Sequence, residues 1–143
     1  MIAGLKFARA QAAAADIAMQ MAHLHADMAP TVITHLPTAS RRIRLRGYDQ
    51  SALIARSLAQ QLRIPYIPLL IRMSQHRQVG ESRAARQAAA RNLFRAKTMP
   101  LVRRAHVLVV DDVITTGASL EAAASVLRAA GAARVDAITF AAA

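Results

Sequence analysis

The sequence contains no cysteine and no tryptophan, and aromatic residues make up only 3% of its 143 residues. Without cysteine the protein can form neither a disulfide nor a thiolate metal site, so redox chemistry does not indicate its compartment. With so few aromatic side chains, the core must be built from Ala, Leu, Ile and Val packed between layers. Such a core suits helices packed on a sheet, and the length suits one domain. The composition therefore predicts a single α/β domain over residues 1–143.

Acidic residues are also scarce, because 8 Asp and Glu stand against 19 Lys and Arg, which gives a formal net charge of +11. Most of the positive charge falls in residues 38–106, where Asp49 and Glu81 are the only acids. A segment of this charge attracts polyanions: nucleic acid, an anionic surface, or a pyrophosphate with its metal.

A long apolar run without charge is missing as well. Residues 1–29 are apolar and rich in Ala, but Lys6, Arg9 and Asp16 interrupt them. They therefore resemble neither the apolar region of a signal peptide nor a membrane span. We expect a mostly buried helix at residues 5–27, no membrane span, and a cytoplasmic protein as the default.

The most informative stretch is residues 107–119, which reads Val-Leu-Val-Val-Asp-Asp-Val-Ile-Thr-Thr-Gly-Ala-Ser. Its four consecutive apolar residues predict a strand that is buried on both faces and ends at Asp111 and Asp112. A small, hydroxylated loop follows, and residues 120–130 predict a helix with Gly131 just beyond its end.

This order of strand, acid pair, hydroxyl loop and helix suits a phosphorylated sugar. The N-terminus of a helix attracts phosphate through its unpaired N–H groups, and Thr115, Thr116 and Ser119 add hydroxyl donors. Carboxylates accept hydrogen bonds from neighbouring ribose hydroxyls. Neighbouring strand residues point to opposite faces, so both acids can reach one sugar only if the chain turns at Asp112. The alternative is an ordinary parallel strand whose acids face solvent before a capped helix.

Residues 107–119 resemble the ribose-5-phosphate loop of the type I phosphoribosyltransferases, which bind phosphoribosyl pyrophosphate (PRPP), and every position of that pattern is filled. The resemblance implies a three-layer α/β fold with a mainly parallel sheet. It implies Asp111 and Asp112 as catalytic acids, and Mg²⁺ as a cofactor that arrives with PRPP and that these two acids could also bind. It assigns the 5′-phosphate to Thr115, Thr116, Gly117, Ala118 and Ser119.

A second segment, residues 38–50, follows a predicted strand at residues 31–36 and carries four arginines within six positions. Ligands gather at the carboxyl ends of parallel strands, so this segment is expected beside the acid loop. The resemblance places the family's pyrophosphate loop here. Guanidinium groups grip pyrophosphate through paired hydrogen bonds, and Arg41 and Arg42 are the nearest candidates. A solvated charge run is the alternative.

Within this segment, Arg46-Gly47-Tyr48-Asp49-Gln50 resembles a signature of the ComF/GntX family, which is associated with competence for DNA uptake and has a phosphoribosyltransferase-like domain. Many relatives carry an N-terminal, cysteine-rich zinc module, which is absent from this sequence. Either this is a shorter branch of the family or only the transferase-like domain is present. Asp49 is also predicted as the N-cap of a helix at residues 50–62.

The remaining segments complete an expected sheet and its cover. Residues 66–71 predict a strand near an edge, and residues 134–140 predict one more strand. By resemblance, residues 72–95 correspond to the family's mobile hood, with Gln78 and Arg86 near its pattern and Glu81 where Leu is usual. A solvated helix with unpaired arginines is the alternative for this segment.

The sequence leaves three candidate functions. The first is an enzyme that binds Mg-PRPP and transfers phosphoribosyl to a nitrogen nucleophile, with release of pyrophosphate. The second is a non-catalytic ComF-like protein of DNA uptake that binds nucleic acid through its basic surface, although aromatic side chains for base stacking are few. A metal-dependent phosphodiesterase ranks last, because further clustered acids or histidines are lacking. The sequence does not define the acceptor, and a homodimer stays open as an assembly.

Overall fold

The structure is a computed structural model that describes residues 2–24, 27–73, 80, 82–85, 88, 92–97, 99–114 and 117–142. Its elements, in chain order, are α1 (Ile2–Leu24), β1 (Val32–His35), α2 (Ser40–Arg46), α3 (Gln50–Leu62), β2 (Leu70–Arg72), β3 (Phe94–Ala96), α5 (Met99–Val102), β4 (His106–Ile114), α6 (Ala118–Ala129) and β5 (Arg134–Ala142). None of the helices in these ranges has the length and apolar character that crossing a bilayer requires.

The central sheet has the strand order β1-β4-β5, and both pairings are parallel. β4 lies in the middle, with Val107 beside Val32 on one side and Val135 on the other. Beyond β1, Tyr66 adds a single parallel bridge to Ile33. The prediction of a mainly parallel sheet with residues 107–111 in an internal strand is confirmed.

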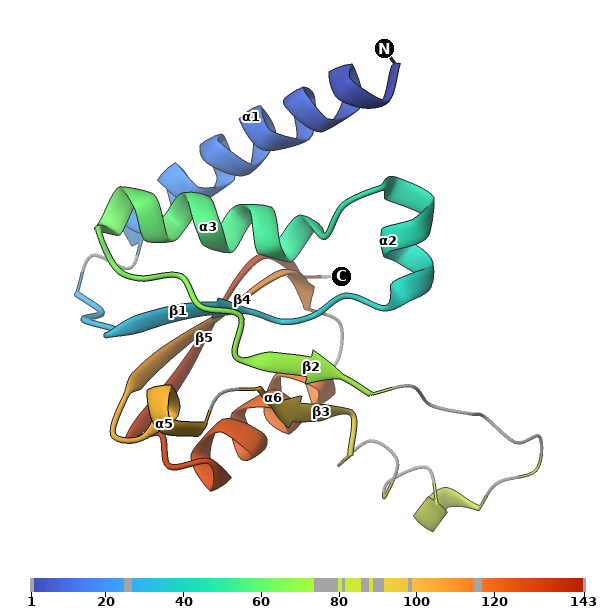
Figure 1. Ribbon diagram of the computed structural model, residues 1–143, viewed down its shortest axis with the longest axis vertical. Helices are drawn as coiled ribbons and strands as arrows, with labels where there is room; N and C mark the ends of the chain where they lie inside the picture. The colour runs from blue at the N-terminus through green and yellow to red at the C-terminus, as the bar shows by residue number, and fades with distance from the viewer. Residues whose placement is uncertain are drawn as a thin grey trace.

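Side chains alternate along β4 and divide the core between the two faces of the sheet. Leu108 and Val110 pack with α1 and α3, whereas Val107 and Val109 pack with α6 and the β2-β3 pair. Figure 1 shows α1 and α3 on one side of the sheet and α6 on the other. The protein is therefore a three-layer α/β fold, in which a strand buried on both faces must be apolar throughout.

The N-terminal helix packs through small residues. Ala10, Ala14 and Ala18 recur at intervals of four and are buried in the core on the α3 side of the sheet. Side chains this small let the α1 and α3 backbones approach closely. The helix predicted at residues 5–27 is confirmed, with bounds shifted toward the N-terminus, but the expectation that it is mostly buried is wrong, because one narrow stripe is buried and most of its described side chains are exposed.

Two predictions about the segments around β1 and β2 are wrong. Residues 38–50 were expected as a loop, but they contain helix α2, which ends at Gly47 in the left-handed conformation (φ 81°). Residues 66–71 were expected as one strand, but only Tyr66 bridges to β1, and Leu70–Arg72 pairs antiparallel with β3. Pro68 breaks the continuous pairing because proline has no N–H to donate.

The predicted end of β4 is also wrong, because the strand continues past the acids to Ile114. β5 supplies the partners for this extension, with Ala141 beside Val113 and Ala142 beside Ile114. β1, in contrast, pairs with β4 only as far as Val110. Among the residues that the structure describes, the far end of β4 therefore has a neighbouring strand on one side only.

The C-terminus of α6 ends in a Schellman motif. The N–H of Gly131 donates to the carbonyl of Arg128 (3.0 Å), and the N–H of Ala132 donates to that of Leu127 (3.1 Å). This pattern needs a left-handed residue at the first position after the cap, and Gly131 has φ 107°. A Cβ placed there would also lie 3.3 Å from the Cγ of Arg103. The prediction that a glycine follows this helix is confirmed.

We expect Gly131→Ala to lower the free energy of unfolding by about 1–2 kcal/mol, because a side chain is strained in the left-handed region. Gly4→Ala is the matched control. Gly4 lies in α1 with open space around it, so the same change should raise stability by about 0.5 kcal/mol through helix propensity. Urea denaturation of both variants checks the pair, and equal effects would contradict the assigned role of Gly131.

Candidate functional site

A cavity of about 540 Å³ opens where β1 ends and β4 continues. Residues that follow β1 form one wall, residues at the end of β4 form another, and the start of α6 closes it. Its charged lining residues are Arg42, Arg46, Arg72, Asp111 and Asp112. The two segments expected to lie together, the arginine-rich segment and the acid loop, therefore open into the same cavity.

The arginines reach this cavity because α2 is helical. Arg42 and Arg46 are four residues apart, so they lie on the same helix face, and both line the cavity. Arg41 is described by the structure but is not among the lining residues. Helical spacing pairs Arg42 with Arg46 but also Arg41 with Arg44, so only the placement of α2 beside the cavity decides that Arg46, and not Arg41, lines it.

The third arginine, Arg72, comes from the end of β2. Its guanidinium donates to the carbonyl oxygen of Pro37 (3.2 Å) and lies over the ring of Phe94, 5.5 Å from the centroid. Burial, and then the nearby charge of Arg42, lower the pKa of Arg72. No sequence signal indicated this residue, since its position depends on the antiparallel pairing of β2 with β3.

Asp111 is held by its neighbours. One carboxylate oxygen accepts hydrogen bonds from the Ser51 hydroxyl (3.0 Å) and from the N–H of Asp112 (2.9 Å). Burial raises the pKa of Asp111 to about 6, and the hydrogen bond from Ser51 partly opposes this effect. Asp111 is thus a carboxyl group that changes charge close to neutral pH.

Asp112 is more exposed and faces a cation. Its carboxylate accepts a hydrogen bond from the N–H of Val113 (3.0 Å) and lies 3.9 Å from the Arg46 guanidinium. β4 continues through Asp112 without the turn that strand alternation would require, and both acids nevertheless line the cavity. Because β1 pairing stops at Val110, the edge of β4 is open there and the cavity extends along it.

The start of α6 contributes Gly117 and Ser119 to the cavity lining. Gly117 is the N-cap in a left-handed conformation (φ 78°), and Ala118 is the first helical residue. Thr115 and Thr116 lie outside the residues that the structure describes. The same holds for the two predicted hood residues, Gln78 and Arg86.

Each residue from Arg46 to Asp49 has a distinct structural role. Arg46 lines the cavity, and Gly47 ends α2. Tyr48 meets Phe7 of α1 edge to face, with ring centroids 6.4 Å apart. Asp49 caps α3, accepting from the N–H groups of Ser51 and Ala52, which confirms its predicted N-cap role.

Beyond Arg46 the basic surface continues into a second hollow, between α1 and α2. This hollow has a volume of about 470 Å³ and is lined by Lys6, Arg9, Ala10, Leu45, Arg46 and Tyr48. Arg46 therefore contacts both hollows, and its neighbours on the α1 side are again cationic.

Among the described residues, few side chains in the cavity could bind a divalent metal ion. Within the described ranges, no cluster of three or more His, Asp or Glu side chains could hold a metal ion by itself. The cavity does offer the adjacent carboxylates of Asp111 and Asp112. This donor set fits Mg²⁺, which commonly uses one or two carboxylates together with water and substrate phosphates.

The sequence pattern of the phosphoribosyl transferase domain matches residues 49–143, about two thirds of the chain. The chain belongs to this family. No curated protein matches it in sequence. The family match confirms the predicted phosphoribosyltransferase superfamily and supports phosphoribosyl transfer in general.

Solved structures of other proteins share the fold. One, an allosteric regulatory enzyme of purine biosynthesis, is 25% identical with a TM-score of 0.67 over 91% of this chain and 26% of its own. The glutamine PRPP amidotransferase of B. subtilis, in complex with ADP and GMP, is 25% identical with a TM-score of 0.63, over 89% and 26%. The chain thus spans about a quarter of either protein.

A third structure, adenine phosphoribosyltransferase of Leishmania tarentolae, is 20% identical with a TM-score of 0.56, over 87% of this chain and 55% of its own. At this identity the likeness shows the fold alone. Together these structures confirm the predicted α/β class with a mainly parallel sheet.

The raised pKa of Asp111 predicts how this phosphoribosyl transferase domain responds to pH. A carboxyl group whose pKa is raised on folding favours the folded state below its unfolded pKa, and that contribution is lost as the pH rises through about 6. Asp111→Asn stays neutral and should therefore be more stable than wild type at pH 8, by about 1 kcal/mol after allowance for solvent access.

This advantage should shrink as the pH falls toward 4. Asp16→Asn, on the exposed face of α1, reports the general effect of removing one negative charge from a basic protein. Urea unfolding of both variants across this pH range makes the comparison. An Asp111→Asn effect equal to that of Asp16→Asn at every pH would contradict the buried-carboxyl assignment.

Proposed function

We propose that the protein binds Mg-PRPP and transfers its phosphoribosyl group to a nitrogen nucleophile, with release of pyrophosphate. The observation that carries this proposal is the single cavity in which two carboxylates, three guanidinium groups and the start of α6 meet. A ligand that suits this lining has hydroxyl groups in its middle and anionic groups at its ends. PRPP is such a ligand, and the family match supports it.

Each part of PRPP finds a chemically suitable partner. The ribose hydroxyls would donate to Asp111 and Asp112, since carboxylates accept such bonds in pairs. The 5′-phosphate would lie at Gly117 and Ser119, at the N-terminus of the 12-residue helix α6, where the helix dipole favours an anion. The pyrophosphate would lie between Arg42 and Arg72, which line the same cavity.

Catalysis of this transfer depends on charge and position more than on covalent chemistry. As the bond to C1 breaks, positive charge develops on the sugar and negative charge on the departing pyrophosphate. Ionised carboxylates near the sugar would stabilise the first, and Arg42 and Arg72 would stabilise the second. Mg²⁺, held by PRPP oxygens with Asp111 and Asp112, would supply further neutralisation of the pyrophosphate.

Membership of the ComF/GntX branch is a narrower proposal, and it rests on residues 46–50. Of these residues Arg46 lines the cavity, Gly47 ends the helix that carries it, and Asp49 starts the next helix, so the motif supports one wall of the site. A non-catalytic, nucleic-acid-binding protein of this branch is the second candidate. The basic lining that continues past Arg46 onto α1 favours it, because Lys6 and Arg9 lie outside the PRPP cavity.

The acids are tested with Asp111→Asn combined with Asp112→Asn. We expect PRPP binding at pH 8 with Mg²⁺ to fall by at least about 100-fold, because both hydroxyl acceptors lose their charge. The fold should persist, and stability should not fall, since two adjacent like charges are removed. Isothermal titration calorimetry measures the affinity, and circular dichroism checks the fold. Asp16→Asn should bind PRPP as wild type does, and an unchanged affinity in the double variant would refute the ribose assignment.

The arginines provide a matched pair of adjacent residues with the same charge. Arg42→Gln removes a guanidinium from the cavity and should weaken pyrophosphate binding about 10-fold, or about 1.4 kcal/mol. Arg41→Gln changes the net charge equally but not the cavity lining, so its effect should stay within about twofold. Equal losses in both variants would show that binding depends on total charge, as in nucleic-acid binding, and would favour the second candidate.

A further inference from the structure

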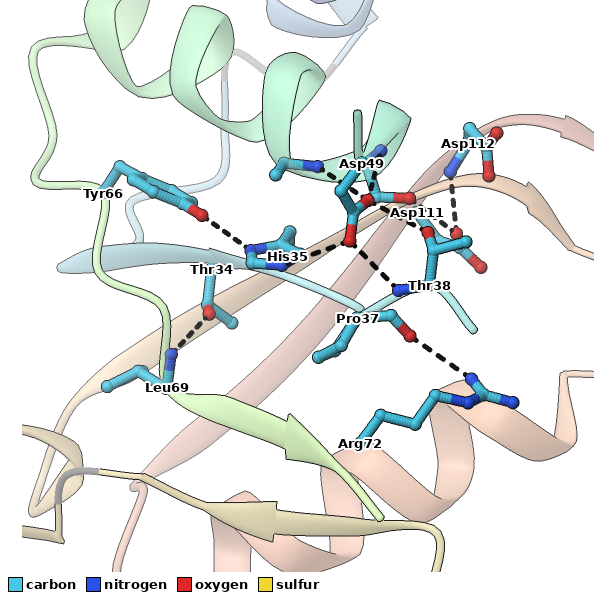
Figure 2. A network of polar contacts seen from close by, with 12 residues as sticks. Thr34, His35, Pro37, Thr38, Asp49, Tyr66, Leu69, Arg72, Asp111 and Asp112 are labelled. Atoms are coloured by element: carbon cyan, nitrogen blue, oxygen red, sulfur yellow. Dashed lines mark hydrogen bonds and ion pairs between the residues drawn. The ribbon is translucent and has the colours of Figure 1, made fainter. Parts of the chain in front are cut away.

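Asp49 does more than cap α3. Its carboxylate accepts hydrogen bonds from two N–H groups at the start of α3, those of Ser51 (3.1 Å) and Ala52 (3.3 Å). It also accepts the N–H of Thr38 (3.1 Å) and the Thr38 hydroxyl (2.9 Å), eleven residues earlier in the chain. Figure 2 shows Asp49 at the centre of this network, between Thr38 and His35. An ordinary N-cap serves its own helix, whereas this one also fixes a second segment.

The Thr38 side of the network leads to the arginines. Thr38 lines the cavity and lies two residues before α2, which carries Arg42 and Arg46. The N-cap of α2, Ala39, makes no side-chain hydrogen bond. The start of this short helix is therefore anchored from outside, through the bonds between Thr38 and Asp49.

The Ser51 side leads to the acids. Ser51 is fully buried, its N–H donates to Asp49, and its hydroxyl donates to Asp111 (3.0 Å). The same Asp111 oxygen accepts the N–H of Asp112. Because Asp49 and the surrounding core hold Ser51 in place, the Ser51 hydroxyl fixes the orientation of the Asp111 carboxylate in the cavity.

A histidine closes the network on the β1 side. His35 Nε2 faces the Asp49 carboxylate at 3.6 Å, and Nδ1 lies 2.7 Å from the Tyr66 hydroxyl. Burial lowers the pKa of His35 despite the opposing charge of Asp49, and Arg56 and Lys97 lower it further. A neutral His35 does not compete strongly with Thr38 for Asp49, so both Thr38 bonds can persist.

We propose that Asp49 is the positioning residue of the site: one carboxylate holds the arginine-bearing helix through Thr38 and the acid Asp111 through Ser51. This inference rests on the proposed function, because it assigns the two sides of the network to the two halves of PRPP. The pyrophosphate half depends on the Thr38 connection. The ribose phosphate half depends on the Ser51 connection. Asp49 touches neither half.

The two connections can be weakened separately by nearly isosteric changes. Thr38→Val removes only the hydroxyl that bonds Asp49, and Ser51→Ala removes only the hydroxyl that bonds Asp111. Inorganic pyrophosphate and ribose 5-phosphate, titrated separately by calorimetry at pH 8 without Mg²⁺, probe the two halves of the site.

We expect Thr38→Val to weaken pyrophosphate binding about fivefold and to change ribose 5-phosphate binding less than twofold. Ser51→Ala should show the reverse pattern. Asp49→Asn keeps one side-chain oxygen for capping α3 but replaces the other by a donor, so it should weaken both ligands. Tyr66→Phe, which removes a hydroxyl at the far end of the network, should change either affinity less than twofold and serves as the control.

The outcomes separate this inference from the proposed function. If Thr38→Val and Ser51→Ala weaken both ligands equally and in proportion to their loss of thermal stability, Asp49 is merely structural and the inference is overturned. It is also overturned if both variants bind like wild type. If folded wild-type protein binds neither half ligand nor Mg-PRPP, the proposed function itself fails, and the positioning role fails with it.

Discussion

The unequal length of the strands beside β4 is the constraint on which the rest of the site depends. β5 pairs with β4 as far as Ile114, whereas β1 stops pairing at Val110. The chain leaves β1 through Leu36 and Pro37, and proline cannot continue a ladder because it lacks an N–H. The edge of β4 is thereby left open where its sequence changes from apolar to acidic. A cavity, rather than a further strand, occupies that edge.

The scarcity of acids makes their placement informative. Of the 8 acidic residues, three are concentrated here, with Asp111 and Asp112 in the cavity and Asp49 behind it. The surrounding positive charge attracts anions from a distance. At hydrogen-bonding distance the carboxylates accept hydrogen bonds, which hydroxyl groups can donate. A ligand that satisfies both must carry anionic and hydroxyl groups on one small molecule. A phosphorylated sugar meets this requirement, whereas a simple polyanion does not.

The polar network around Asp49 connects parts of the site that come from distant segments. Thr38, Ser51 and Asp111 follow or belong to three different elements, and a single carboxylate and one hydroxyl join them. A carboxylate that is removed from water costs free energy unless it accepts hydrogen bonds, and Asp49 accepts four of them. Asp49 belongs to residues 46–50, and this one motif therefore contains the end of α2, the aromatic contact of Tyr48 and the start of α3.

Much of the fold was determined by the sequence itself, because it depends on local or periodic signals. The apolar run before Asp111 predicted an internal strand, Asp49 predicted the start of α3, and Gly131 predicted the end of α6. The predicted site residues include Arg42, the acid pair, Gly117 and Ser119, and the structure places these five in one cavity. Their roles toward PRPP remain predictions.

Only the tertiary structure decided which other side chains join them. Arg46 rather than Arg41 lines the cavity because of where α2 lies beside it, and Arg72 is there because β2 pairs with a strand more than twenty residues later. The continuation of β4 to Ile114 depends on the length of β5, which no local pattern around Asp112 reveals. Which strands pair, and which face of a helix turns toward the cavity, depend on residues far apart in the sequence. Residue types alone therefore identified the chemistry of this site but not its full geometry.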